Sequence, residues 1–275
     1  MTTTALPLPR SSTQGIMLTV LIALLPATAV HIWFAGSAWA LGLLAACLLA
    51  IMLEALALRL RGRDAGVRHQ DGSVLVTAVL LLLLLPISLP WWQSAVAILI
   101  AVVVGKHIFG GLGQNLYNPV ALGYLALMSP HMGLSLPGAT LLQADGQTWV
   151  TATMVLAALS GGMLLLLQRI IGWQVPLAIL LTSIILFYGF DLTINYSVLV
   201  LVAFFVATDP VTCPGTRAGK LIYGSVVAVL SAILTLWLPY TTAMAAAMLC
   251  GNAITPSLDH IIRYDWIVAQ PGKKS

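Results

Sequence analysis

The chain has 275 residues, of which 60% are hydrophobic and only 7% are charged, and its formal net charge is +4. A soluble domain of this length needs a charged surface that this composition does not supply, so we expect an all-α integral membrane protein. No basic stretch alternates with aromatic residues, which argues against a nucleic-acid partner. Cys47, Cys213 and Cys250 are widely spaced and form no Cys-x-x-Cys pair, so they support neither a zinc site nor an iron–sulfur cluster.

Apolar segments follow one another along almost the whole chain. The polar N-terminus, Met1 to Gln14, leads into an apolar run without a cleavage site, so we predict a retained helix rather than a signal peptide. A helix needs roughly 20 residues to cross about 30 Å of hydrocarbon, and fewer where it is broken. Ten transmembrane helices are therefore predicted, at about 16–34, 38–59, 73–90, 92–108, 115–132, 150–168, 174–190, 194–209, 220–239 and 241–260.

The basic residues predict the orientation of these helices. If the N-terminus lies inside, all 12 Lys and Arg residues fall on the inner side, and the outer connections carry none. The positive-inside rule therefore predicts a multi-pass protein of the bacterial inner membrane with both termini in the cytoplasm. The basic residues are Arg10, Arg59, Arg61, Arg63, Arg68, Lys106, Arg169, Arg217, Lys220, Arg263, Lys273 and Lys274.

Two proline-broken segments suggest that the chain is built from related halves. When Ser73-Val-Leu-Val is aligned with Ser197-Val-Leu-Val, Pro86-Ile-Ser-Leu-Pro90 meets Pro210-Val-Thr-Cys-Pro214 without a gap. Five helices per half would place the second half in the opposite orientation, as in many transporters; chance similarity between Leu- and Val-rich helices is the alternative. The predicted units are a cytoplasmic tail at 1–15, a first repeat at 16–132, an outer (periplasmic) loop at 133–149, a second repeat at 150–260 and a cytoplasmic tail at 261–275.

The segment from Asp209 to Lys220, called the Asp209 break below, is a candidate site at membrane depth. We expect Asp209 to end a helix, because the following Pro210 has no N–H to continue it. Thr212 adds a hydroxyl beside the carboxylate. The break is either a lining for a polar cofactor or ion path, or a simple helix stop in which Asp209 pairs with Arg217 or Lys220.

A second candidate is the segment from Gly110 to Pro119, called the Gly-rich bend below. It contains Asn115 and Asn118 and ends in Asn-Pro. Its backbone amides could hold an anionic or carbonyl-bearing ligand, although a tight helical hairpin explains the same residues. The pattern Asn115-x-x-Asn-Pro119 is echoed later by Asn252-x-x-Thr-Pro256.

Acidic residues are rare in the apolar helices. Glu54 lies inside one of them, and we expect it to pair with Arg59 or to face the bundle, with a proton relay as the alternative. Asp71 precedes a predicted helix and is expected to cap it.

The predicted outer loop contains Pro137-Gly-Ala-Thr140. From the residues alone this is an ordinary polar turn. The small residues Gly138 and Ala139 nevertheless leave the Thr140 hydroxyl open to an enzyme that would modify it.

Five stretches together resemble one protein family, the RnfD (RsxD) membrane proteins of the Rnf (Rsx) electron-transport complex. The NqrB protein of the sodium-pumping NADH:quinone oxidoreductase is the nearest relative of that family, and the resemblance covers about Met17 to Asp259. The stretches are Asp71-Gly-Ser, Pro90-Trp-Trp, Gly105-Lys106-x-Ile-Phe109-Gly-Gly-Leu-Gly-Gln-Asn115-x-x-Asn-Pro119, Phe204-Phe-x-x-Thr-Asp209-Pro-Val-Thr and Gly219-Lys-Leu-Ile-Tyr-Gly224.

This resemblance implies two inverted five-helix repeats, similar to urea transporters, in a complex that couples electron transfer between ferredoxin and NAD to sodium or proton movement. It implies FMN joined by a phosphoester bond to Thr140, with Gly138 and Ala139 beside it, and riboflavin near the membrane. Implied partners are iron–sulfur and flavin subunits, a flavin transferase and membrane lipid. The chain would be one component of an oxidoreductase complex rather than an enzyme alone.

The outer loop is shorter than in typical members. Leu-Pro-Gly-Ala-Thr-Leu-Leu also lacks the usual serine two residues before the alanine and the proline after the threonine. A solute or ion transporter of the inverted-repeat type, without a redox role, is the alternative function. In the leading interpretation, Asn115, Asn118, Asp209 and Thr212 are the further candidate cofactor-binding residues, at the inner flavin or ion path.

Overall fold

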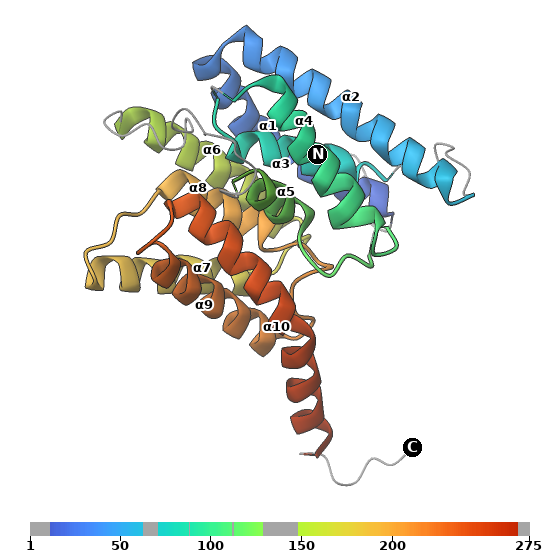
Figure 1. The fold of residues 1–275 in the computed structure, drawn as a ribbon. Helices are drawn as coiled ribbons and strands as arrows, with labels where there is room; N and C mark the ends of the chain where they lie inside the picture. Colours follow the sequence, from blue (N-terminus) through green and yellow to red (C-terminus); the bar gives the residue numbers. More distant parts are fainter. Residues whose placement is uncertain (1–11, 63–70, 88, 112, 129–147, 269–275) are drawn as a thin grey trace, which may run out of the picture.

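A computed structural model describes residues 12–62, 71–87, 89–111, 113–128 and 148–268, and all regular structure in these residues is helical (Figure 1). Two α-helices continue directly into π-helices, in which a backbone N–H bonds to the carbonyl five residues earlier. The elements are α1 (Thr13–Ala35), α2 (Ser37–Leu60), α3 (Ser73–Leu84), α4 (Trp91–Leu99), η1 (Ile100–His107), α5 (Pro119–Met128), α6 (Thr148–Leu167), α7 (Gln174–Gly189), α8 (Tyr196–Leu201), η4 (Val202–Val206), α9 (Arg217–Leu234) and α10 (Tyr240–Val268).

Ten α-helices in the described residues match the predicted number. Four helical segments, Thr13–Ala35, Ser37–Leu60, Trp149–Leu167 and Arg217–Leu234, are long and apolar enough to cross a membrane. Five further apolar helices have 10–17 residues. Long apolar helices together with several shorter ones indicate a multi-pass membrane protein.

α3 and the segment α8–η4 end earlier than predicted, each shortly before a proline, and α9 ends at Leu234 rather than at about 239. α3 was expected to reach residue 90 but ends at Leu84, and Leu85 is extended with φ −76° and ψ 151°. A residue before proline disfavours the helical conformation, so Pro86 forces this ending. The helix expected to end at Asp209 ends instead with η4 at Val206, one turn before Pro210.

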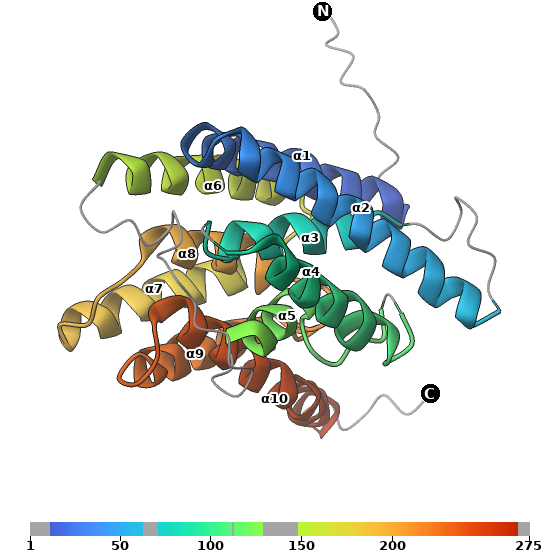
Figure 2. The same ribbon diagram turned by 45° about the horizontal axis from the view of Figure 1, so that its top comes forward.

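The helices form three layers in Figure 2. α1 packs against α2 and α6 on one side of the molecule, and α9 packs against α7 and α10 on the other. The shorter helices α3, α4, α5 and α8 lie between these layers. The approach of α1 to α6 depends on Gly161, because a Cβ atom there would lie 1.9 Å from the carbonyl oxygen of Ala23.

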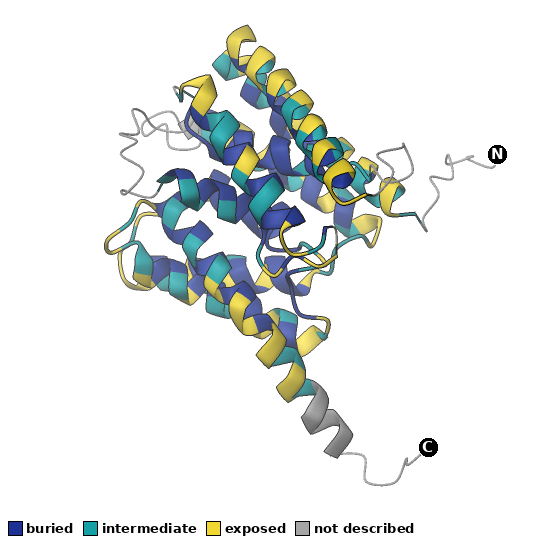
Figure 3. Cartoon of the chain, turned by 45° about the vertical axis from the view of Figure 1, so that its right-hand side comes forward, coloured by how far each residue is buried: buried dark blue, intermediate teal, exposed yellow. Residues whose placement is uncertain are grey.

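The most buried helices are the short central ones. Every residue from Ser197 to Val206 is buried, and so are ten of the twelve residues of α3. Helices that are apolar all round belong in a core. α2 differs, because one of its faces is exposed along its whole length (Figure 3). That face carries Leu41, Leu44, Leu48, Met52, Leu56 and Leu60.

Candidate functional site

The Gly-rich bend begins where η1 ends. Gly110, Gly111 and Gly113 have φ values of 128°, 105° and 85°, which side chains rarely adopt. The N–H of Gly111 bonds to the carbonyl of Lys106 at 3.0 Å, which closes the last turn of the π-helix. The bend then runs through Asn115 to the start of α5 at Pro119.

Asn118 connects this bend to the second half of the chain. Its side-chain Nδ2 donates to the carbonyl of Val206 at 2.9 Å, at the end of η4. Its Oδ1 accepts the N–H groups of Val120 and Ala121 at 2.9 and 3.3 Å, which caps α5. Asn118 thereby holds the Gly-rich bend against the last residue of η4, three residues before Asp209.

Asp209 lies in the turn after η4, with its carboxylate turned toward Asn115 and Asn118. Its Oδ1 accepts the N–H of Val211 at 3.1 Å, its Oδ2 accepts the Thr212 hydroxyl at 3.4 Å, and the Asn115 side chain also bonds to it. The alternative pairing with Arg217 or Lys220 is not observed: Asp209 makes no ion pair within the described part of the chain. Its carboxylate accepts hydrogen bonds from neutral donors instead.

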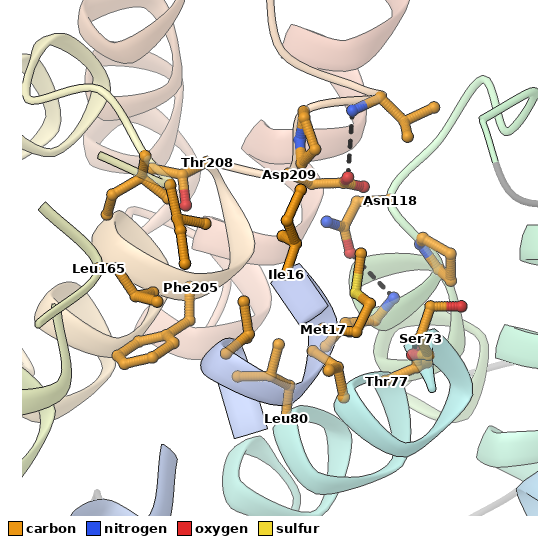
Figure 4. A pocket seen from close by; sticks show the side chains of 18 of the residues that line it. Ile16, Met17, Ser73, Thr77, Leu80, Asn118, Leu165, Phe205, Thr208 and Asp209 are labelled. Atoms are coloured by element: carbon orange, nitrogen blue, oxygen red, sulfur yellow. Dashed lines mark hydrogen bonds between the residues drawn. The ribbon is translucent and has the colours of Figure 1, made fainter. Parts of the chain in front are cut away.

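A cavity of about 190 Å³ lies between the Gly-rich bend and the Asp209 break. Figure 4 shows Asn118 and Asp209 at one side of it, with Ser73 and Thr77 of α3 and Ile16 and Met17 of α1 around it. Most of the wall is apolar. Its polar lining consists of Ser73, Thr77, Lys106, Asn115, Asn118, Thr208 and Asp209.

Lys106 is a functional candidate that the motif analysis did not single out. Its ammonium donates to Glu54 Oε1 at 2.5 Å and to the Ser73 hydroxyl, and Asp71 Oδ1 lies 3.6 Å away. The side chains of Lys106 and Glu54 are only 5% and 3% exposed. The expected pairing of Glu54 with Arg59 was therefore wrong, whereas the alternative that Glu54 faces the bundle is confirmed. Arg59 lies more than one turn further along α2, whereas Lys106 faces Glu54 across the bundle. One feature of the sequence could have pointed to Lys106, which is the only Lys or Arg between Arg68 and Arg169.

Asp71 binds the first residue of α3, although it is not the N-cap that was expected. Its Oδ1 accepts the N–H of Ser73 at 2.8 Å, while Gly72 with φ 78° occupies the cap position itself.

The remaining predicted site residues fall into two groups. Thr212 lies beside the cavity rather than in its wall, and its carbonyl accepts bonds from Asn252 and Thr255. Thr140, Gly138 and Ala139 lie outside the described residues. The described part of the chain contains no group of three or more His, Cys, Asp or Glu side chains that could hold a metal ion.

Comparison of the sequence with known proteins shows its family. Residues 7–267 match the model of the NQR2, RnfD, RnfE family. The chain belongs to this family. Members of it can therefore be compared with the chain over nearly its whole length.

Three relatives illustrate the similarity, each named as the D component of an ion-translocating oxidoreductase complex. The protein of Pseudomonas aeruginosa strain LESB58 is 33% identical over 94% of this chain and 95% of its own length. Those of Aeromonas hydrophila and Sodalis glossinidius are both 31% identical, over 92% and 91% of this chain and 94% and 93% of their own lengths. The alignment with the Pseudomonas protein extends over 326 positions, more than the 275 residues here, so that relative contains segments which this chain lacks.

Proposed function

We propose that the chain is a membrane component of an Rnf-type ion-translocating oxidoreductase complex that relays electrons through flavin. The observation that carries this proposal is the match to relatives named as the D component of such a complex, over at least nine-tenths of both chains. The partners would be the other membrane subunits and the iron–sulfur and flavin subunits. They would supply electrons that this chain, with no cluster-binding motif, does not supply itself.

The first flavin site in this proposal is Thr140. Its hydroxyl would form a phosphoester with FMN on the outer face, added by a flavin transferase. Bound FMN supplies one- and two-electron chemistry, while the protein determines position and electrostatic surroundings. Gly138 and Ala139 would leave the threonine accessible to the transferase.

The second element of the proposal is the cavity, as the site of a non-covalent flavin ring or of the ion path. A flavin ring is flat and apolar with one hydrogen-bonding edge, and the cavity has an apolar wall at Leu80, Phe204 and Phe205. Asn115 and Asp209 also line the cavity and would serve as donor and acceptor for the edge. The volume of about 190 Å³ is below the roughly 300–1,000 Å³ of pockets that enclose whole drug-sized ligands. It therefore suits the ring end of riboflavin alone.

The residues of this chain would orient such a ligand rather than react with it. Asp209 would accept a hydrogen bond, and Lys106, held by Glu54 and Ser73, would place a fixed positive charge in the cavity wall. The apolar residues around them exclude water, which strengthens these electrostatic interactions.

The inverted repeat and the orientation also belong to this proposal. Contacts between helices support the repeat. Equivalent helices of the two halves pack on each other, α1 on α6 and α5 on α10. The contact of α2 with α4 in the first half also has its equivalent in the contact of α7 with α9 in the second. The basic residues support the orientation, because Arg59, Arg169 and Arg217 all lie at helix ends predicted to be inside.

Mass spectrometry of the complex, expressed together with its flavin transferase, tests the covalent flavin. Trypsin cuts after Lys106 and Arg169 and nowhere between, so the peptide 107–169 contains Thr140 and every nearby threonine. We expect the mass of an FMN phosphoester on Thr140 in the wild type and its loss in Thr140→Val. An unmodified wild-type peptide would refute the covalent site.

The broken central helices favour a second candidate function, a solute or ion transporter without a redox role. α3 and α8–η4 start within one residue of aligned positions, end near Pro86 and Pro210, and are only 12 and 11 residues long, as in transporters that bind substrate at broken helices. Solute uptake by the isolated protein in liposomes without an electron donor would support this function over the first.

A further inference from the structure

One face of α10 carries a row of three polar side chains that hold the Asp209 break. Asn252, Thr255 and Asp259 are spaced by three and four residues, so they lie on the same side of the helix. The Thr255 hydroxyl donates to the carbonyl of Thr212 at 3.2 Å. Both carboxylate oxygens of Asp259 accept the N–H of Gly215 at 3.1 Å. α10 therefore binds the backbone of the break at two points.

Asn252 differs from the other two because it also reaches the Gly-rich bend. Its Oδ1 accepts the backbone N–H of Asn118 at 3.0 Å, and its Nδ2 donates to the Thr212 carbonyl at 3.3 Å. A third bond joins Nδ2 to the Tyr223 hydroxyl of α9 at 3.0 Å. The residue is 1% exposed, so no water replaces a lost partner at low cost.

The two backbone groups held by Asn252 belong to two segments that both contribute residues to the cavity wall. Asn118 is itself a lining residue, and Thr212 directly follows the lining residues Asp209, Pro210 and Val211. One carboxamide thus bridges the Gly-rich bend, from the first half of the chain, and the Asp209 break, from the second half. α5 and α10 pack together at this point, with α9 on the other side of α10 (Figure 1).

We propose that Asn252 is the positioning residue of this cavity: it fixes the distance between the Gly-rich bend and the Asp209 break. Where the cavity holds a flavin ring, Asn252 sets the ligand's fit without touching it. This last step rests on the proposed function, whereas the bridging role does not.

Cys213 provides a built-in reporter for the bridging role. It is buried, at 9% exposure, and directly follows Thr212. With Cys47 and Cys250 replaced by alanine, the rate of maleimide labelling in native membranes containing the assembled complex reports opening of the break. In Asn252→Ala the Thr212 carbonyl loses one partner and Asn118 N–H loses its only one, at about 1–3 kcal/mol for each unsatisfied group. We therefore expect labelling to become about tenfold faster or more.

Two control variants separate this role from a general loss of stability. Ser231→Ala removes a buried hydroxyl on α9 that bonds only to Ala228 within its own helix. Tyr223→Phe removes the α9 partner of Asn252 but leaves both bonds that join the two segments. Both controls should label Cys213 at the wild-type rate. Equal rates in Asn252→Ala and Ser231→Ala would overturn the proposal.

A conservative variant separates the two sides of the bridge and covers the case in which Asn252→Ala does not assemble. Asn252→Asp retains an oxygen to accept the Asn118 N–H, and as an ionised carboxylate it has no donor for Thr212. We expect fast Cys213 labelling in this variant as well; labelling at the wild-type rate would count against the proposal.

Non-covalent flavin retained by the purified complex is the second readout. We expect the flavin content to fall in Asn252→Ala and to stay unchanged in Tyr223→Phe. If the wild-type complex retains no such flavin, the cavity part of the proposed function fails, and the labelling rates alone decide whether Asn252 joins the two segments.

Discussion

Lys106 places a positive charge in a part of the protein from which water is nearly excluded. Its three oxygen neighbours come from α2 and from the start of α3, so this one side chain joins three elements of the first half. A buried ion pair contributes little compared with an apolar pair, yet removing one partner leaves an uncompensated charge. At the scale of single residues, this cluster is where substitution should have the largest effect on stability.

Lys106→Met should therefore lower the free energy of unfolding by about 3–5 kcal/mol, because Glu54 loses its counter-charge. The double variant Glu54→Gln with Lys106→Met should recover a large part of this loss. Both effects are measured by heating the proteins in detergent and determining by size-exclusion chromatography how much folded protein remains at each temperature. Arg59→Met is the matched control, since Arg59 is exposed on the last turn of α2 and should change stability by less than about 0.5 kcal/mol. A Lys106→Met protein with the same melting temperature as the Arg59→Met control would contradict the expectation.

At the scale of elements, close contacts between helices from different halves hold the molecule together. Small residues permit these contacts, because helices within a membrane associate by close packing rather than by exclusion of water. α1 and α6 meet at Gly161, while Gly162 lies against Phe204 of η4. This packing keeps α1 and η4 together at the wall of the cavity, to which both contribute residues.

Gly161→Ala should destabilise the protein by about 1–3 kcal/mol, because the added methyl group would overlap the Ala23 carbonyl and force α1 and α6 apart. Gly42→Ala on α2 is the control. A Cβ atom there meets nothing within 4 Å, and alanine favours the helix by up to about 1 kcal/mol. The two variants should shift the melting temperature in opposite directions. Equal shifts of the melting temperature in the two variants would show that α1 and α6 can move apart at Gly161 without loss of stability.

At the scale of the whole molecule, the basic residues gather at one predicted side. Arg59, Arg169 and Arg217 lie at helix ends predicted to be inside, and positive charges favour the cytoplasmic side. Exposed indole rings lie at both predicted sides, Trp33 and Trp91 outside and Trp173 inside, because they favour either interface. The same orientation would place Thr140 outside and the Asp209 break inside.

Reporter fusions test this orientation. Green fluorescent protein fused after Ser275 should fluoresce, and alkaline phosphatase at the same point should be inactive, because the C-terminus is predicted to be cytoplasmic. Fusions truncated within residues 133–147 should give the reverse result. An active phosphatase after Ser275 would show that the helix count or the orientation is wrong.

Local sequence was sufficient for much of the fold. Hydrophobic runs longer than a membrane is thick can only be helices, and prolines such as Pro86 and Pro210 end them, so ten helices and their breaks could be predicted from composition and spacing. The fine boundaries were less accurate. Proline restricts the residues before it as well, and π-turns close the ends of η1 and η4.

Only the tertiary structure showed which polar residues pair with each other when they are far apart in the chain. Nothing local to Glu54 indicates that its counter-ion is Lys106, 52 residues away, and the nearer Arg59 was the reasonable expectation. The bond from Asn118 to Asn252 spans 134 residues. The sequence by itself determined which polar residues enter the apolar helices, because burial there is costly and each needs a partner. Which partner each one finds depends on how the two halves pack, and local sequence does not encode that packing.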